Sequence, residues 1–321
     1  MKKITASLLF VCTSIFSFGQ FAGPPGTPGT TAMFRDSSAF INWASSSQLE
    51  LGLIDIANEF SGTAASGDAS SPTGFPDGLC ISLGDSGVAI LTFPQPITNE
   101  PGPDFAVFEN GFSDGFLELA FVEVSSDGTN FTRFPAVSNT QTDTQIGPFN
   151  ALGDATLLNN LAGKYRANFG TPFDLEELSG TPGLDISAIT HIKVIDVVGM
   201  INGNHVQFDS NGNAINDPYA TAFPQGGFDL DAIGVIHQGP LGIEDNIGSY
   251  FKIYPNPVQS SGILSISTQF QIENLTLLSL SGQVLSKSSS NSLQLDNCPS
   301  GIYLLQIQMA DFIYSSKIVV R

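Results

Sequence analysis

A stretch rich in oxygen-bearing side chains, "FDSNGNAINDPYATAFPQGGFDLDAIG" (residues 208–234), has the spacing of a calcium-binding loop. Oxygen side chains stand at loop positions 1, 3, 5 and 9, and a backbone carbonyl is available at position 7. The candidate side-chain ligands are Asp209, Asn211, Asn213 and Asp217, and the candidate carbonyl is that of Ile215. Ca²⁺ accepts such mixed cages of carboxylate, amide and carbonyl oxygens. The spacing therefore predicts calcium as a cofactor.

The loop differs from an EF-hand in two ways. An EF-hand has Gly at position 6 and Glu at position 12, where this sequence has Ala214 and Ala220, and no flanking helices are predicted. Carboxylates from elsewhere would have to complete the site, and Asp229 and Asp231 are the candidates because they directly precede the strand-like run "AIGVI". The alternative is an ordinary polar turn, since Asn, Asp and Gly favour turns without any ion.

A second motif, Gly84-Asp85-Ser86-Gly87, has the four letters that surround the nucleophile of chymotrypsin-like serine proteases. That chemistry needs a histidine base and an aspartate that orients it, and in those enzymes both precede the serine. Here all three histidines follow the serine, and the strand-like run "VAIL" begins directly after the motif. Turn chemistry accounts for every residue of the motif. We predict a turn between two strands.

Carboxylate pairs are a further catalytic possibility. Glycoside hydrolysis needs two carboxyl groups about 5–10 Å apart, and Glu109, Glu118 and Glu123 lie on or near predicted strands. Alternation along a strand can place them on different faces, and nothing in the sequence selects one acid and one base. The sequence has no GxSxG, HExxH or CxxC motif and no phosphate-binding glycine loop. No catalytic residue is therefore assigned.

Aromatic side chains could form a platform for a carbohydrate, although core packing is the commoner role of phenylalanine. The candidates are Trp43, Phe112, Phe116, Phe149, Tyr165, Phe169, Phe173, Tyr219 and Phe223. Tyr219 and Phe223 flank the calcium-like loop, and we predict that these two form an exposed ligand-binding edge.

The elements that must hold these residues are strands. Short runs rich in Val, Ile, Phe and Thr alternate with clusters of Gly, Pro, Asn and Asp, and long helical apolar patterns are scarce. Two such runs around Asp127-Gly128, in "VEVSSDGTNFTRF", predict a strand, a tight turn and a return strand. The fold class is therefore predicted to be all-β.

The first 19 residues are predicted to be a secretory signal peptide. Lys2 and Lys3 precede an apolar run, and Ser17-Phe18-Gly19 has the small-residue pattern of a cleavage site. No other stretch approaches the ~20 apolar residues of a membrane span, so none is expected. Beyond the signal peptide, Cys80 and Cys298 lie far apart, which argues against a disulfide framework.

The rest of the chain consists of a strongly acidic part and a nearly neutral part. Residues 20–238 contain 25 Asp and Glu against five Lys and Arg, a net charge of −20, whereas residues 239–321 contain five acids and four bases. Such acidity argues against nucleic acid or anionic lipid as partners, because both need clustered Lys and Arg. A connector with Gly and Pro, placed at 239–248, separates an acidic module from a C-terminal domain at 249–321.

The C-terminal segment contains "YPNPV", "LLSLSGQVL", "PSGIYLLQI" and the closing "KIVV". These are short strands joined by tight turns, typical of a small Ig-like β-sandwich. In wording and order the segment closely resembles the type A C-terminal sorting domain of the Bacteroidetes type IX secretion system. The resemblance implies that the secretion machinery and its sortase-like component are partners, and that the protein is secreted or displayed on the outer-membrane surface after export to the periplasm.

The acidic module resembles other known proteins less specifically. "VEVSSDGTNFTRF" and "HIKVIDV" are similar to parts of discoidin-like, galactose-binding-like jelly rolls, and the wider set of motifs over 35–237 resembles a poorly characterised family of secreted bacterial cell-surface proteins. The resemblance implies a jelly-roll-like β-sandwich. We hypothesise a non-catalytic module that binds a glycan or another extracellular ligand with the assistance of calcium; the alternatives are a polymer hydrolase with a carboxylate pair and a structural or adhesive envelope protein.

Overall fold

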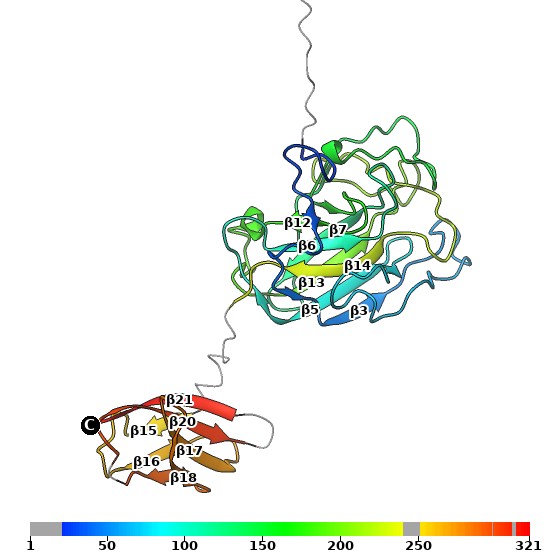
Figure 1. Ribbon diagram of the computed structural model, residues 1–321. Coiled ribbons are helices and arrows are strands. Elements are labelled where there is room, and N and C mark those ends of the chain that lie inside the picture. Colours follow the sequence, from blue (N-terminus) through cyan, green and yellow to red (C-terminus); the bar gives the residue numbers. More distant parts are fainter. Residues whose placement is uncertain (1–20, 240–250, 297, 310–312) are drawn as a thin grey trace, which may run out of the picture. The chain divides into compact units, whose positions relative to one another are not determined.

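The described residues of the computed structural model are 21–239, 251–296, 298–309 and 313–321. The chain divides into two compact units, Met1–Gly239 and Pro240–Arg321 (Figure 1). The predicted signal peptide, and the predicted connector apart from Gly239, lie outside the described residues. The expected boundaries of these two segments stay predictions.

The first unit contains two six-stranded sheets in which every pairing is antiparallel. The first sheet has the order β1-β12-β6-β14-β2, with β4 also paired to β14. Its strands are β1 (Met33–Phe34), β2 (Asn42–Trp43), β4 (Ile81–Ser82), β6 (Phe105–Glu109), β12 (Phe169–Phe173) and β14 (Asp229–Val235). The second sheet has the order β11-β7-β13-β5-β3, with β8 paired to β7. Its strands are β3 (Ser46–Glu50), β5 (Val88–Ile97), β7 (Ala120–Ser125), β8 (Thr132–Arg133), β11 (Leu161–Ala162) and β13 (Ile189–Asp196).

One buried cluster joins the two sheets. The first sheet contributes Phe105 and Ile233, among others, and the second contributes Val122, Ile192 and Leu91; each of these side chains is fully buried. Alternate residues of β13 point into this cluster, as the period of a β-strand requires. The unit is therefore an all-β sandwich of the jelly-roll-like kind that the sequence predicted.

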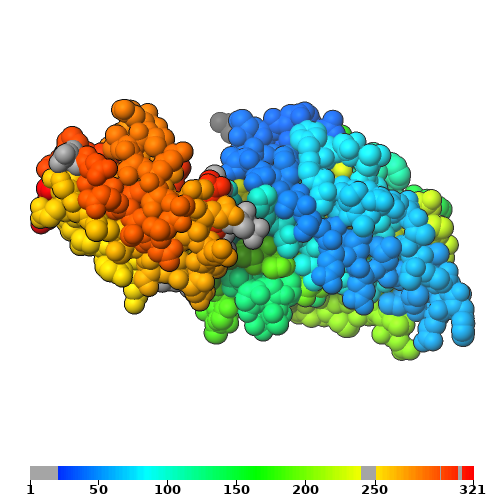
Figure 2. Space-filling model, turned by 90° about the horizontal axis from the view of Figure 1, so that it is seen from below, coloured from blue at the N-terminus to red at the C-terminus, as the bar shows by residue number. Residues whose placement is uncertain are grey.

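Loops and short segments cover the outer faces of both sheets. Phe40 and Trp43 pack on Phe108 behind the first sheet, with ring centroids 5.5 and 5.7 Å from it. The N-terminal segment, coloured blue in Figure 2, forms much of the visible surface of this unit. Behind the second sheet, loop residues such as Ile215 pack against Phe121 in a separate buried cluster.

The loops carry two further kinds of short element. A small two-stranded sheet pairs β9 (Val137–Ser138) with β10 (Leu158–Asn159). Two 3₁₀ helices, η1 (Ala155–Leu157) and η2 (Leu175–Leu178), follow Asp154 and Asp174. Each aspartate accepts a backbone N–H of its helix, which satisfies a donor that the helix leaves free.

The second unit is a smaller sandwich with its own core. One sheet has the order β15-β16-β19 and the other β18-β17-β20-β21, and all pairs are antiparallel. The strands are β15 (Lys252–Tyr254), β16 (Ile263–Ser267), β17 (Asn274–Ser279), β18 (Val284–Ser288), β19 (Ser292–Gln294), β20 (Gly301–Gln308) and β21 (Ile313–Val320). Leu264, Leu277 and Leu305 are fully buried between the sheets. The small Ig-like sandwich was predicted correctly.

Helices long and apolar enough to cross a membrane are absent from the part of the chain that the structure describes.

Candidate functional site

Asp209 organises the predicted calcium loop as a hydrogen-bond acceptor. Its carboxylate accepts the backbone N–H groups of Ser138, Asn211 and Asn213 at 3.0, 2.9 and 2.8 Å, and the side-chain amide of Asn213 at 3.2 Å. The side chains of Asn211 and Asn213 are otherwise exposed. The loop is thus closed by internal hydrogen bonds, as in an Asx turn.

The other predicted ligands lie in separate surroundings. Asp217 accepts the backbone N–H of Leu119 at 3.0 Å, and Asp231 accepts that of Gly78 at 3.2 Å. The Ile215 side chain is fully buried in the loop-side core. Within the described ranges, no group of three or more His, Cys, Asp or Glu side chains could hold a metal ion. Calcium binding stays a prediction.

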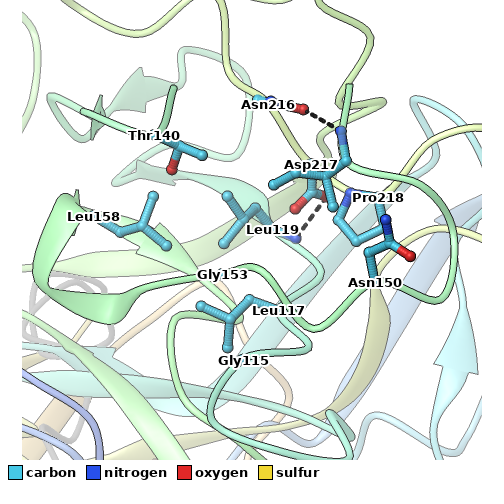
Figure 3. Close-up of a pocket in the computed structure, with 11 residues that line it drawn as sticks. Gly115, Leu117, Leu119, Thr140, Asn150, Gly153, Leu158, Asn216, Asp217 and Pro218 are labelled. Carbon is cyan, nitrogen blue, oxygen red and sulfur yellow. Dashed lines mark hydrogen bonds between the residues drawn. The ribbon is translucent and has the colours of Figure 1, made fainter. Parts of the chain in front are cut away.

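A narrow cavity of about 10 Å³ lies beside Asp217 (Figure 3). Asn216 anchors its rim, because its side-chain oxygen accepts the N–H of Ile146 at 3.0 Å while its amide donates to the carbonyl of Gln141 at 2.7 Å. A space of this size holds about one water molecule. The cavity lies among the hydrogen bonds that anchor the loop, and it has no room for an organic ligand.

The Gly84–Gly87 motif is a turn between β4 and β5, as predicted. Gly84 has a φ of +71° and Ser86 a φ of +61°, and the N–H of Gly87 donates to the carbonyl of Gly84 at 2.9 Å. A Cβ on Gly84 would lie 2.8 Å from the Ala64 side chain, so glycine is required there. The N–H of Ser86 donates to the buried carboxylate of Asp196 at 2.9 Å. The Ser86 hydroxyl is 3.5 Å from the amide nitrogen of Gln207, which cannot act as a base.

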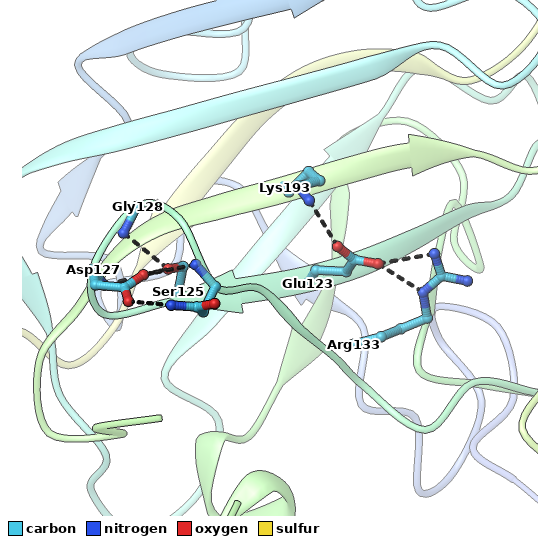
Figure 4. Close-up of polar contacts among 7 residues, drawn as sticks. Glu123, Ser125, Asp127, Gly128, Arg133 and Lys193 are labelled. Atoms are coloured by element: carbon cyan, nitrogen blue, oxygen red, sulfur yellow. Dashed lines mark hydrogen bonds and ion pairs between the residues drawn. The ribbon is translucent and has the colours of Figure 1, made fainter. Parts of the chain in front are cut away.

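Glu123, one of the candidate catalytic carboxylates, is held in ion pairs on β7 (Figure 4). Its carboxylate lies 2.9 Å from the Arg133 guanidinium and 3.0 Å from the Lys193 ammonium. Next to it, Asp127 accepts the N–H groups of Thr129 and Asn130, both at 2.8 Å, which forms the predicted tight turn. Glu123 therefore has a structural role on this face of the sheet.

The first unit also contains an aromatic–acidic pocket of about 450 Å³. Its lining residues are Phe112, Phe116, Glu118, Phe149, Phe223, Gln225 and Asp229. They come from the loop between β6 and β7, the loop before η1, and the segment that enters β14. A pocket of this volume, with apolar walls and a few polar groups, is typical of a small-ligand site.

Two pairs of phenylalanine rings form the apolar walls of the pocket. The Phe149 and Phe223 rings are stacked with centroids 5.7 Å apart, and the Phe112 and Phe116 rings are tilted with centroids 5.5 Å apart. Phe112 is 84% exposed and Phe149 is 78% exposed. The two pairs thus form a contiguous exposed apolar patch, and a patch of this kind makes the pocket a candidate binding surface.

Glu118 brings a carboxyl group to the pocket without a partner from the protein. Its side chain is only 8% exposed, and no hydrogen bond or ion pair to it occurs among the described residues. Glu109, which is 1% exposed, uses one oxygen to accept the N–H of Gly111 at 2.7 Å, while its other oxygen is buried without a partner. Asp229 accepts the hydroxyl of Ser82. Buried polar atoms without partners, such as this Glu109 oxygen, are rare in folded proteins.

Burial and mutual repulsion keep these carboxyl groups protonated to unusually high pH. Burial, and then the charges of Glu109 and Asp229, raise the pKa of Glu118 to about 10. Burial raises the pKa of Asp229 to about 6, against the hydrogen bonds from Ser82 and Cys80. Burial and the Asp229 charge also raise the pKa of Glu109 well above its ordinary value. At neutral pH the pocket thus combines a protonated Glu118 with an ionised Asp229.

The pocket unites some of the predicted site residues and separates others. Phe223 lines it, whereas Tyr219 lies elsewhere, with its hydroxyl 3.4 Å from the Asp55 carboxylate. Asp229, predicted as a metal ligand, lines the same pocket as Glu118. Gln225 had no signal in the sequence that could have selected it.

Comparison with known families identifies the C-terminal segment. The model of the secretion system C-terminal sorting domain matches residues 252–321, which are the second unit from β15 to the last residue. No curated protein matches the chain.

Solved structures resemble the chain only distantly. A β-glucuronidase of Ruminococcus gnavus has 10% sequence identity and a TM-score of 0.21, covering 74% of this chain and 36% of that chain. The same enzyme in complex with uronic isofagomine has 11% identity and a TM-score of 0.21, over 74% of this chain and 35% of that one. The BSP domain of a biofilm associated protein has 10% identity and a TM-score of 0.18, over 88% of this chain and 53% of that one. Such TM-scores say nothing further about this chain.

The motifs of the C-terminal segment, its separate seven-stranded core and the family match agree. Residues 252–321 are a C-terminal sorting domain of the type IX secretion system, which directs the chain to the cell surface or the medium.

Proposed function

We propose that the first unit is a non-catalytic binding module for an extracellular glycan, and that the aromatic–acidic pocket is its binding site. The observation that carries the proposal is the combination of four phenylalanine rings with the unpartnered carboxyl group of Glu118 in one pocket of about 450 Å³. The sorting domain supports an extracellular ligand, because it sends the acidic module out of the cell.

The chemistry of a sugar ring suits both parts of the pocket. The C–H face of the ring packs on aromatic side chains, as Phe149 and Phe223 would allow. The hydroxyl groups of the sugar can donate to the Asp229 carboxylate and can exchange hydrogen bonds with Glu118, which has no hydrogen-bond partner among the described residues. The exposed amide of Gln225 adds a donor and an acceptor at the edge of the pocket.

A glycan microarray probed with the full labelled chain tests this proposal, with titration calorimetry on the glycans that bind. We expect Phe149→Ala to lower the affinity about tenfold or more, since one stacked ring contributes roughly 1.4 kcal/mol. Phe60→Ala is the matched control, because Phe60 is 94% exposed and does not line the pocket. Absence of binding to any glycan, or binding that Phe149→Ala leaves unchanged, would contradict the proposal.

A second candidate is hydrolysis of an extracellular polymer, and one observation favours it. Glu118 and Asp229 line the same pocket with pKa values near 10 and 6, and a carboxyl pair with separated pKa values can divide into an acid and a base. Release of reducing ends from a bound glycan, abolished by both Glu118→Gln and Asp229→Asn, would establish this activity. Binding without turnover favours the binding module.

Calcium is the cofactor that we propose to assist this function, at the loop from Asp209 to Asp217. The support for it is the ligand spacing in the sequence. The hydrogen bonds that close the loop set a condition on the proposal, because an ion that reaches the Asp209 carboxylate must displace N–H donors. The two partners that we propose beyond the glycan are the type IX secretion machinery and its sortase-like component. A signal peptide at residues 1–19 is proposed for the earlier export to the periplasm.

A further inference from the structure

We propose that the ligand of the aromatic–acidic pocket carries a positive charge, and specifically that it is a glycan whose amino sugars are deacetylated and hence ammonium ions. This inference rests on the proposed function, and it names the chemical class of the glycan.

The first support is an excess of carboxyl groups without a cation to balance them. Glu109, Glu118 and Asp229 influence one another electrostatically, and none of the three forms an ion pair with Lys, Arg or His within the described part of the chain. Asp229, whose pKa is about 6, is the group that is ionised at neutral pH, whereas the raised pKa of Glu118 keeps its proton in place. A neutral sugar could satisfy the hydrogen bonds of both groups, but only a cation would also balance the charge of Asp229.

The second support is that the nearby basic side chains are already engaged. Arg166 pairs with Asp114, which lies in the same loop as Phe112 and Phe116, at 2.5 Å. Lys164, which is buried, donates to the carbonyl of Leu158 at 2.7 Å. Neither side chain lines the pocket. A cation that balances Asp229 would therefore come from outside the protein.

The aromatic walls decide between an organic cation and a metal ion. The face of an aromatic ring attracts an ammonium group, and that attraction reaches about 2 kcal/mol where the cation is desolvated. Phe112 and Phe149 offer such faces, since both are largely exposed at the mouth of the pocket. A divalent cation prefers a shell of oxygen ligands, and the described residues bring together no group of three or more His, Cys, Asp or Glu that could hold one. A sugar that carries an ammonium group would match both the phenylalanine walls and the carboxyl groups of the pocket.

The volume of the pocket and its stacked rings favour a sugar as the carrier of the ammonium group. The pocket has a volume of about 450 Å³, which is within the range of sites that bind small organic ligands and more than a single lysine side chain fills. Stacking on Phe149 and Phe223 requires a flat ligand face, which a sugar ring has and a lysine stem lacks.

Titration calorimetry of the full chain tests the inference with four probes at pH 6. The probes are the tetramer of β-1,4-linked glucosamine, the same tetramer fully N-acetylated, tetralysine and the tetramer of β-1,4-linked glucose. We expect the glucosamine tetramer to bind about tenfold tighter than its acetylated form, and the preference to shrink at 0.5 M salt, because salt screens the charge.

Variants of pocket residues test which side chains cause the preference for the glucosamine tetramer. Asp229→Asn should abolish the preference for the glucosamine tetramer while leaving the acetylated tetramer bound, because Asp229 is the carboxyl group of the pocket that is ionised near neutral pH. Glu50→Gln is the control, since it removes one carboxylate from an exposed position on β3. Phe149→Ala should weaken the binding of both tetramers, which keeps the test valid if Asp229→Asn fails to fold.

The outcomes separate the two proposals. Equal or tighter binding of the acetylated tetramer or of the glucose tetramer would overturn the charge inference and leave a neutral-glycan module. Tighter binding of tetralysine than of the glucosamine tetramer would overturn the assignment to a sugar. If none of the three sugar tetramers binds, and the microarray also finds no glycan, both proposals fail.

Discussion

The rings of Phe149 and Phe223 stack nearly parallel, with their planes 10° apart, although one residue precedes η1 and the other precedes β14. Phe149 remains 78% exposed in this arrangement. The pair is therefore held by loops and presents a ring face to the solvent, which is the property that a carbohydrate platform needs.

Replacement of Phe149 by Ala should have little effect on stability. An exposed ring loses little burial when it is truncated, and only the contact with Phe223 is removed, a loss of about 0.5–1.5 kcal/mol. We expect the melting temperature to fall by a few degrees at most, while ligand affinity falls about tenfold. Thermal melting and calorimetry on the same preparation compare the two effects. A large loss of stability would show that the ring belongs to the core.

Much of the fold could be predicted from local patterns. The alternation of apolar residues in "HIKVIDV" predicts a strand, and β13 has that alternation in its burial. The turns at Gly84–Gly87 and Asp127-Gly128 were predictable because Gly, Asp and Ser have specific roles in turns. The sorting domain was predictable because its motifs lie in a fixed order within one short segment.

The pocket was not predictable, because three loops distant in sequence build it. Glu118 lies between Leu117 and Leu119 in the segment that leads into β7. An apolar–acidic alternation of this kind normally indicates a strand with one face in solvent. Instead all three side chains are buried, because the loops on both sides cover the segment. Only the three-dimensional arrangement shows that Asp229 joins Glu118, and that Phe112 and Phe149 face the same space.

The raised pKa of Glu118 predicts a pH-dependent effect of Glu118→Gln. With its raised pKa, Glu118 keeps its proton in the folded state up to about pH 10, whereas the unfolded chain releases it near the ordinary glutamate pKa of 4.5. Between these values the folded state binds more protons, so this group's contribution to stability falls as pH rises, by at most about 1.4 kcal/mol per pH unit. Glutamine cannot titrate. The melting temperature of Glu118→Gln minus that of the wild type should therefore increase from pH 5 to pH 9.

Glu50→Gln is again the control for this measurement, because Glu50 is exposed on β3. Its melting temperature should differ from that of the wild type by a small and nearly constant amount over the same pH range. A constant difference for Glu118→Gln as well would mean that Glu118 titrates normally in the folded protein.

The calcium proposal predicts that millimolar calcium raises the melting temperature of the first unit by several degrees and that chelator reverses the effect. An ion that binds only the folded state adds about 2.7 kcal/mol when its concentration is 100 times Kd. Magnesium should do less, because it tolerates irregular oxygen cages poorly. Asp209→Ala separates the two roles of this carboxylate. If Asp209 is a calcium ligand, the melting temperature of the variant no longer rises with calcium. If Asp209 is only a turn residue, the variant is destabilised equally with and without calcium.

Deletion of residues 252–321 should stop export without unfolding the first unit. The first unit has its own core, centred on residues such as Phe105 and Val122, and the second unit has a separate one around Leu277. In a host with the type IX system we therefore expect the truncated chain to accumulate in the periplasm, with an unchanged melting temperature for the remaining unit. Immunoblots of periplasm, cell surface and medium measure the distribution. A truncation of the first unit's loop 112–116 that keeps the sorting domain is the control, and it should still be exported. Undiminished surface or medium levels after deletion of 252–321 would contradict the role of this segment as an export signal.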